Sequence, residues 1–215
     1  MLTLHAAPLV LPVGAPPVAD GAVAVEGDTV AAIGPYDEVA AAHPGARVRR
    51  WPGVLTPGLR QWHAVWLLTR AYHPDPREYD ELGDRPLTGE RLAALVMTET
   101  RRAGSVRRGL QQMLSHGTTA VAGTFTDPVV SAAVARSGLR VVSALRAPGI
   151  LVGEPDLDPF REAFDLPGAA GAPLAVGGRA DLAVFDVPDE AALPTAGAGT
   201  CVATVLGGRL VHRRR

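Results

Sequence analysis

Residues 71–84 place an imidazole among several carboxylates, a combination of side chains that can bind a metal ion. In "AYHPDPREYDELGD", His73 is followed by Asp75, Glu78, Asp80 and Glu81. Imidazole and carboxylate groups are both ligands of divalent metals. A polar surface loop punctuated by prolines is the alternative interpretation of the same composition. We therefore take His73 as a candidate metal ligand and keep the surface loop as the competing hypothesis.

The other residues that could do chemistry have structural explanations. The single cysteine, Cys201, excludes an internal disulfide and a multi-cysteine zinc site, and its strand-like surroundings predict a small buried side chain. His116 stands at the predicted C-terminus of a helix, where a protonated imidazole favours the helix dipole. Asp127 is the predicted cap of a helix, Asp181 a turn residue, and His212 part of a terminal strand. No serine–histidine–aspartate spacing or phosphate loop stands out, so no catalytic residue is assigned.

Charge and composition narrow the class of partner. The chain has 21 basic residues, all of them arginine, and 22 acidic residues, which give a formal net charge of -1. This balance gives no electrostatic reason to expect nucleic acid or an anionic membrane, and we interpret Arg213–Arg215 as a solvated tail. No apolar stretch reaches the length of a membrane span and no basic leader is present, so we expect a cytoplasmic protein. Without lysine, Schiff-base catalysis and a carbamylated-lysine metal bridge are excluded.

Both ends of the sequence are predicted to form β structure. The expected elements are a hairpin over 21–34, a short helix over 36–45, two extended pieces over 46–58, a strand within 173–188 and a hairpin over 200–215. Glycine and proline pairs separate these pieces, as they do at turns. Each end has too few strands for a stable sheet, so we expect the two ends to fold together.

The middle of the chain has helical periodicity. The expected elements are helices over 88–103 and 105–116, a strand over 118–125, a helix over 127–138 and a strand over 139–145. The strand, helix and strand that end this series predict a right-handed βαβ unit with parallel strands. We therefore predict a mixed α/β fold. Residues 1–57 with 173–215 form a composite β-sandwich, residues 58–172 form a reduced α/β segment, and residues 153–173 lead back to the sandwich.

This order of parts resembles the amidohydrolase superfamily, in particular imidazolonepropionases and aminodeoxyfutalosine deaminases. "GAVAVEGDTVAAIGP" is similar to the opening hairpin of that family, "VLTPGL" to the exit toward the first barrel strand, and "VGGRADLAVFD" with "VATVLGGRLV" to the return strand and closing hairpin. "HGTTAVAG" and "SGLRVVSA" are similar to the second and third barrel strands. The resemblance implies a sandwich built from both chain ends with a metal-bearing (β/α)8 barrel inserted between them.

The inserted segment is too short for that barrel. A (β/α)8 barrel needs about 250 residues, and about 200 at the least. Only about 115 residues separate Pro57 from Pro173, which is room for about three strand–helix units. In the family, the later strands carry the remaining metal ligands and the catalytic aspartate. We therefore expect a truncated barrel that lacks them.

The resemblance also assigns a role to the first barrel strand. In the family this strand ends in "PGLVNAHTH", and its two histidines bind zinc or iron. Here His63 matches the first histidine and Val65 the second. Because valine has no lone pair, one ligand is lost. His63 is thus a candidate metal ligand, and a histidine packed or half-exposed beside Trp62 and Trp66 is the alternative.

Three functions follow from these observations. We expect a catalytically degenerate amidohydrolase relative with an accessory or interaction role and no cofactor, bound to an unknown protein partner or to itself as a homodimer. The alternative is a metal-dependent hydrolase of non-peptide carbon–nitrogen bonds, in a cyclic amide, an amidine or a purine-type amine, with zinc or iron and a site completed by a partner subunit. The third is a non-functional remnant. A truncated barrel exposes strand edges, and we expect the loop after His73, the helix over 88–103 or a second chain to cover them.

Overall fold

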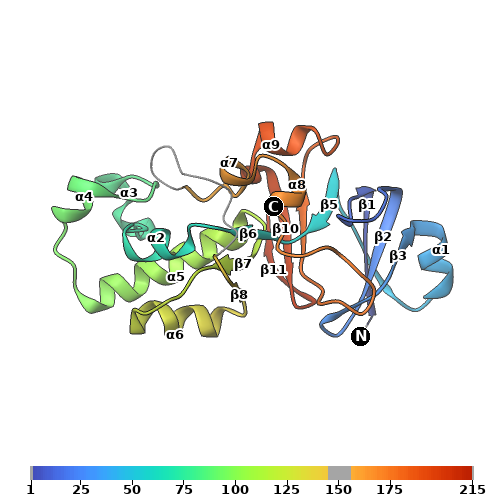
Figure 1. The fold of residues 1–215 in the computed structure, drawn as a ribbon, viewed down its shortest axis with the longest axis horizontal. Helices are drawn as coiled ribbons and strands as arrows, with labels where there is room; N and C mark the ends of the chain where they lie inside the picture. Colours follow the sequence, from blue (N-terminus) through green and yellow to red (C-terminus); the bar gives the residue numbers. More distant parts are fainter. Residues whose placement is uncertain (1, 145–155, 215) are drawn as a thin grey trace.

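Strands from both ends of the chain join in one hydrogen-bonded sheet. The computed structural model describes residues 2–144 and 156–214. The strands of this large sheet are β1 (Leu2–Val10), β2 (Val18–Glu26), β3 (Thr29–Pro35), β4 (Arg47–Arg50), β5 (Val54–Pro57), β9 (Leu182–Phe185), β10 (Cys201–Leu206) and β11 (Arg209–Arg213). Their order is β11-β10-β9-β5-β1-β2-β3, with β4 paired to β1 (Figure 1). The antiparallel pair β5–β9 connects the two chain ends, with Leu55 opposite Val184. The expectation that the ends fold together is confirmed.

Local turn signals build the two hairpins of this sheet. The β2–β3 turn follows Glu26, and the β10–β11 turn consists of Gly207 (φ 52°) and Gly208 (φ 74°). Two successive residues of positive φ form the tight turn that fits the twist of a hairpin. A Cβ on Gly208 would also overlap the carbonyl oxygen of Gly27, so the two turns pack against each other. Both predicted hairpins are therefore confirmed, and glycine is required at position 208 for two independent reasons.

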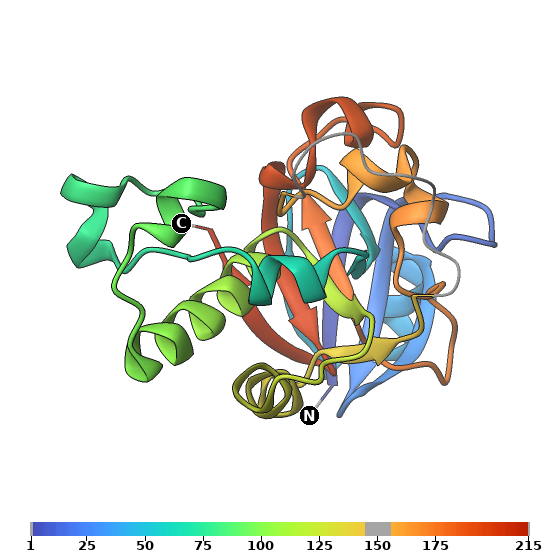
Figure 2. The ribbon, with the colours of Figure 1, turned by 60° about the vertical axis from the view of Figure 1, so that its left-hand side comes forward.

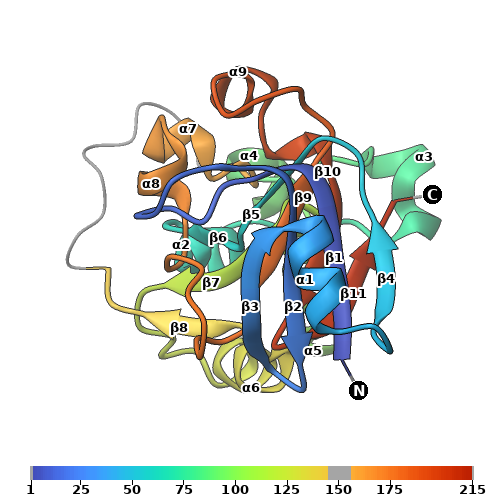
Figure 3. The ribbon, with the colours of Figure 1, turned by 90° about the vertical axis from the view of Figure 1, so that its right-hand side faces the viewer.

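The strands enclose an apolar core. The side chains that meet in it come from β1, β2, β5, β9 and β10 and include Val23, Leu55, Leu182, Val184 and Val205. Helix α1 (Tyr36–Ala42) packs its Val39 against β2 and β3 over a second, smaller cluster. Figure 3 shows α1 lying across the face of these strands.

A second sheet contains three parallel strands. They are β6 (Leu59–Gln61), β7 (Thr118–Ala122) and β8 (Arg140–Val142), in the order β6-β7-β8. Helix α6 (Pro128–Ser137) connects β7 to β8; the Asp127 side chain accepts hydrogen bonds at its N-terminus and Gly138 (φ 78°) ends it. The predicted βαβ unit is therefore confirmed. Helices α2 (Ala64–Thr69) and α5 (Glu99–Ser115) pack beside this sheet (Figure 2).

The predicted helices over 88–103 and 105–116 are wrong in their boundaries. Helix α4 (Gly89–Ala93) is only a short turn, and α5 runs without a break from Glu99 through Gly104. Thr98 explains the start of α5, because its side chain accepts a hydrogen bond from the Arg101 N–H at 3.2 Å. The loop before α4 contains the 3-10 turn η1 (Pro76–Glu78) and helix α3 (Tyr79–Leu82).

The connector back to the large sheet lies along the outer edge of β6. It contains α7 (Phe160–Ala163) and α8 (Leu166–Ala169), and residues 153–155 of the predicted connector lie outside the described residues. The Gly171 N–H donates to the Gly58 carbonyl at 2.8 Å, and Leu59 forms a bridge with Ala170. The connector therefore covers this edge. We had expected the loop after His73 or residues 88–103 to cover it. Between β9 and β10 lie α9 (Ala192–Ala196) and η2 (Ala198–Thr200).

None of the helices among residues 2–144 and 156–214 is long and apolar enough to cross a lipid bilayer.

Candidate functional site

His63 lies where strand β6 turns into helix α2. The strand ends at Gln61, and His63 is the residue before the first turn of α2. The Gln61 side chain fixes this turn: its Oε1 accepts the His63 backbone N–H at 3.0 Å, and its Nε2 donates to the Asp156 carbonyl at 3.2 Å. Gln61 is 1% exposed, so these bonds satisfy a buried amide.

The His63 imidazole faces a carboxylate from the connector. Its Nε2 lies 3.3 Å from Oε2 of Glu162, on α7, and the two side chains are 24% and 14% exposed. The neighbouring Trp62 is buried and packs under the guanidinium of Arg60, 3.8 Å from the ring centroid. The polar contact of the His63 imidazole is thus this one carboxylate, and its predicted packing against the two tryptophans stays a prediction.

Val65 does not share a strand face with His63. Because β6 has already ended, Val65 belongs to α2 and its side chain fills the space beside Gly123, which follows β7. Alternation along a strand would have placed positions 63 and 65 on the same side. Position 65 is therefore a packing position, both in its residue type and in its backbone conformation.

His73 is fully buried. Its Nδ1 lies 2.5 Å from Oε1 of Gln112 and its Nε2 lies 3.0 Å from the Leu67 carbonyl oxygen. Its backbone N–H donates to Oγ of Ser105 at 2.8 Å. Burial lowers the pKa of the ring, against the hydrogen bonds with Leu67 and Gln112 that raise it. Both ring nitrogens thus have protein partners.

Arginines of α5 pair with the acidic residues that follow His73. Arg108 contacts Asp75 at 3.1 Å and the His73 carbonyl at 2.8 Å. Arg101 contacts Glu78 at 2.8 Å, and the Tyr72 hydroxyl donates to the same carboxylate at 2.5 Å. These carboxylates hold the loop against the helix. The sequence prediction did not include these ion pairs, although the seven-residue spacing of the two arginines along α5 was visible.

The two candidate ligands do not come together with other donors. Within residues 2–144 and 156–214, no group of three or more His, Cys, Asp or Glu side chains could hold a metal ion. His63 has one carboxylate beside it, and His73 has an amide and a carbonyl. The described donor set therefore does not fit the zinc or iron that the family resemblance implies, and the assignment of His63 and His73 as ligands stays a prediction.

The remaining residues singled out in the sequence have structural partners. His116 caps the C-terminal turn of α5, with Nδ1 2.8 Å from the Gln112 carbonyl oxygen. Asp181 accepts the Gly207 N–H at 2.8 Å, and burial raises its pKa. Burial lowers the pKa of His212 and raises that of Cys201, which is completely buried as predicted.

Comparison with known proteins supports the resemblance over one segment. The family model of the bacterial imidazolonepropionase-like composite domain matches residues 21–46, which hold the β2–β3 hairpin and α1. The predicted resemblance is confirmed there. No curated protein matches the chain significantly.

Several solved structures are similar in part. Ochratoxinase from A. niger has a TM-score of 0.45 and 20% identity, over 66% of this chain and 31% of that one. A zinc-bound adenosine deaminase from Xanthomonas campestris has a TM-score of 0.42 and 22% identity, over 65% and 33%. Helicobacter pylori aminofutalosine deaminase has a TM-score of 0.44 and 15% identity, over 66% and 33%. The chain thus spans about a third of the length of the solved structures it matches.

Proposed function

We propose that this protein is a catalytically degenerate relative of imidazolonepropionase-like amidohydrolases, with an accessory or interaction role. The observation that carries the proposal is the position of Val65. The residue that matches the second family histidine has no lone pair, lies in α2 and packs beside Gly123. A strand–turn–helix of this kind offers one imidazole where the family needs two.

The proposal includes the division of the chain. Residues 1–57 with 173–215 are assigned to a composite sandwich, and residues 58–172 to the first three units of a former barrel. The parallel order β6-β7-β8 and the helix between β7 and β8 support this assignment. The sheet that joins β5 to β9 supports the first half of it.

The outer edge of β8 supports an interaction role. Within the described part of the chain, β8 pairs only with β7, and Val141 in its centre is 51% exposed. An open strand edge is a template for pairing with another chain. We propose a second copy of this chain as the partner, because two copies of one strand can pair antiparallel about a two-fold axis. Sedimentation of the wild-type protein and of Val141→Lys tests this, with a dimer that dissociates in the variant as the expected result.

Metal content tests the loss of hydrolysis. The protein is expressed with zinc, iron and manganese supplied, purified, and analysed for each element. We expect a protein that unfolds cooperatively and holds no stoichiometric metal. One equivalent of metal that disappears in His63→Ala, but not in His43→Ala on the opposite part of the molecule, contradicts the proposal. Non-cooperative unfolding would instead support the remnant.

One observation favours the metal-dependent hydrolase as a second candidate. His63 and Glu162 form a partly exposed imidazole–carboxylate pair beyond the end of a parallel strand. Such a pair needs further ligands from another subunit before it could hold a metal. Metal bound by the oligomer, and absent from the monomeric Val141→Lys variant, would favour this candidate over the degenerate relative.

A further inference from the structure

A small polar cavity lies where the first strand, β4 and the β10–β11 turn meet. Its volume is about 210 Å³, and its polar side chains are Thr3, His5, Arg49 and Arg209. Figure 3 shows β4 and β11 on the same side of the large sheet. His63, Val65, His73 and Glu162 are not among its lining residues, so this cavity is separate from the site described above.

Each of these polar side chains can donate a hydrogen bond into the cavity. The two arginines are donors only, and the threonine hydroxyl can donate. Whether His5 can donate a hydrogen bond depends on its tautomer. Its Nδ1 accepts the Trp51 indole N–H at 3.2 Å, so the neutral ring carries its own proton on Nε2. The ring is neutral because burial, together with the charge of Arg49, lowers its pKa to about 4.

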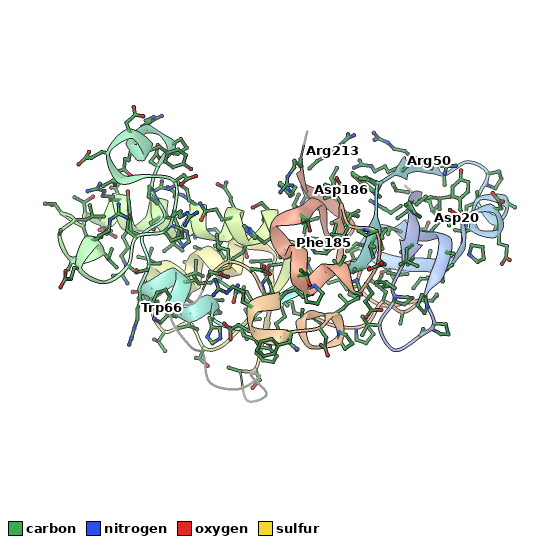
Figure 4. The ribbon with its side chains drawn as sticks, turned by 90° about the horizontal axis from the view of Figure 1, so that it is seen from above. Asp20, Arg50, Trp66, Phe185, Asp186 and Arg213 are labelled. Carbon is green, nitrogen blue, oxygen red and sulfur yellow. The ribbon has the colours of Figure 1, made fainter. Side chains whose placement is uncertain are left out.

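No carboxylate side chain lines this cavity, although Glu26 and Asp28 flank Gly27 in its wall. Neither residues 46–54 nor residues 200–215 contain an aspartate or a glutamate. Among the described residues, no ion pair involves Arg47, Arg49 or Arg209. Arg213 extends from β11 over the Trp51 ring, 5.7 Å from its centroid (Figure 4 labels Arg213). Positive charge therefore accumulates around this cavity although the chain as a whole is nearly neutral.

Arg49 shows that this charge is uncompensated. Burial and the neighbouring Arg47 and Arg213 lower its pKa. Its Nε is shielded from solvent and has no hydrogen-bond partner in the described part of the chain. A buried donor without an acceptor in the chain is costly, and ordered water or a bound ion satisfies such a group.

We propose that this cavity binds a tetrahedral oxyanion, a phosphate group, between Arg49 and Arg209. Guanidinium groups bind phosphate oxygens through paired, charge-assisted hydrogen bonds, and His5 Nε2 and the Thr3 hydroxyl supply further donors. The cavity has room for inorganic phosphate or for the phosphate of a small monoester. Arg49 and Arg209 are thus the charged residues of this binding site.

Calorimetric titration with inorganic phosphate tests the site, with ionic strength held constant by sodium chloride. We expect saturable binding that weakens at least tenfold in Arg49→Gln and in Arg209→Gln. Arg50→Gln is the matched control. It removes the same charge from the same strand, but its side chain lies over the Tyr36 ring at 4.1 Å, on the other face of β4. The phosphate affinity of Arg50→Gln should stay within twofold of that of the wild-type protein.

Further arms identify the source of the phosphate group. Glycerol 3-phosphate binding more tightly than inorganic phosphate supports a monoester as the ligand, and equal or weaker binding supports the free ion. Acetate binding as tightly as both would overturn the assignment of a tetrahedral oxyanion. So would the absence of saturable phosphate binding, or an equal loss of affinity in Arg50→Gln.

A measurement on the wild-type protein keeps the proposal testable if the arginine variants do not fold. The His5 ring is titrated by ¹⁵N NMR with and without phosphate. Bound phosphate should shift the Nε2 resonance and raise the His5 pKa above about 4, because an anion favours the imidazolium. A pKa unaffected by phosphate contradicts the proposal.

Discussion

Charged side chains have different partners in the large sheet and in the parallel segment, by which we mean β6, β7 and β8 with the helices beside them. In the segment and its connector, acidic and basic side chains pair: His63–Glu162, Arg101–Glu78, Arg102–Asp127, Arg108–Asp75 and Arg161–Asp156. The described strands and turns of the large sheet have one such pair, Arg179–Asp181. Backbone pairing and an apolar core hold the sheet together. The segment also has an apolar core, formed in part by α2 and α5, and its loops and helices carry ion pairs in addition.

This difference explains why Asp75 and Glu78 do not complete a metal site with His73. In the loop after His73, charged side chains take part in the packing against α5. Asp75 and Glu78 were candidates to complete a site with His73, and both are bound by arginines of α5. Among residues 2–144 and 156–214, by contrast, the arginines of β4 and β11 have no acidic partner, which supports the proposed anion site.

Phe185→Ala should have the largest effect and tests whether the two regions unfold together. The ring is fully buried, packs edge-to-face on Phe160 and lies against Gly117, which precedes β7. In Figure 4 it lies between Trp66 of the segment and Asp20 of the sheet. Removing such a ring costs about 3–5 kcal/mol.

Urea unfolding followed by tryptophan fluorescence measures this effect. Two single-tryptophan variants are compared. The fluorescence of Trp51 reports on the sheet in one variant, and that of Trp66 reports on the segment in the other. Both transitions should move to lower urea by the same free energy. Phe164→Ala, which removes a ring that is 74% exposed, is the control and should change stability by less than about 0.5 kcal/mol. A shift of only one transition would mean that the two regions are independent.

Acid should destabilise the protein through His5. The folded-state pKa is about 4, against an ordinary value of 6.5. Between these values the unfolded state binds the proton more readily, so the free energy of unfolding falls as pH decreases from about 6.5 to 4 and is constant below. The integrated loss is on the order of 3 kcal/mol. His73, whose pKa is also lowered by burial, acts in the same direction.

Urea unfolding at several pH values, without phosphate, checks this loss. In His5→Gln the dependence on pH between 6.5 and 4 should flatten, with a residual slope from His73 and His212, whose pKa values burial also lowers. An unchanged slope in His5→Gln would show that the imidazole is not buried in its neutral form. Phosphate should reduce the wild-type slope, which links this measurement to the proposed anion site.

Local signals in the sequence were sufficient to predict the hairpin turns and helix α6. Asp127, Pro128 and Gly138 bound α6 as predicted, because a cap, a fixed φ and a left-handed stop act within a few residues. The same holds for the hairpin at Gly207-Gly208. The break before α5 was missed, because Thr98 was a weaker signal than the apolar periodicity that continued through Leu95 and Val96. Val96 is in fact 79% exposed.

The contacts that decide function required tertiary structure. Trp51 and His5 are 46 residues apart in the chain, and their hydrogen bond fixes the His5 tautomer. Neither residue carries a local pattern that indicates the other. Likewise, the substitution at Val65 was visible in the sequence, but the end of β6 at Gln61 was not. The spacing of the family motif shows which residue types stand at positions 63 and 65. The backbone conformation at these positions depends on contacts with the connector, such as that between Gln61 and Asp156.

Glu78→Gln tests how far the segment depends on ion pairs. Burial opposes ionisation, but hydrogen bonds from Tyr72, the Asp75 N–H and Arg101 hold the pKa of Glu78 below its ordinary value. Because Glu78 is partly exposed, we expect a loss of only about 1 kcal/mol above pH 5, and a smaller salt dependence of stability than in wild type. Asp80→Asn, on an exposed side chain, is the control. Equal salt dependence in Glu78→Gln and wild type would contradict a role for this pair.

His63→Ala should have the smallest effect and sharpens the contrast with the family site. The ion pair with Glu162 is partly exposed, so its loss should cost less than about 1 kcal/mol. The turn into α2 depends on Gln61, whose side chain accepts the His63 backbone N–H whatever the residue at position 63. Gln61→Ala should therefore cost more, about 2 kcal/mol, since it leaves the partly buried His63 N–H and the Asp156 carbonyl without their partners. Urea unfolding of the two variants measures the difference. The reverse order, with His63→Ala the more damaging, would mean that this imidazole still organises the end of the strand as a ligand would.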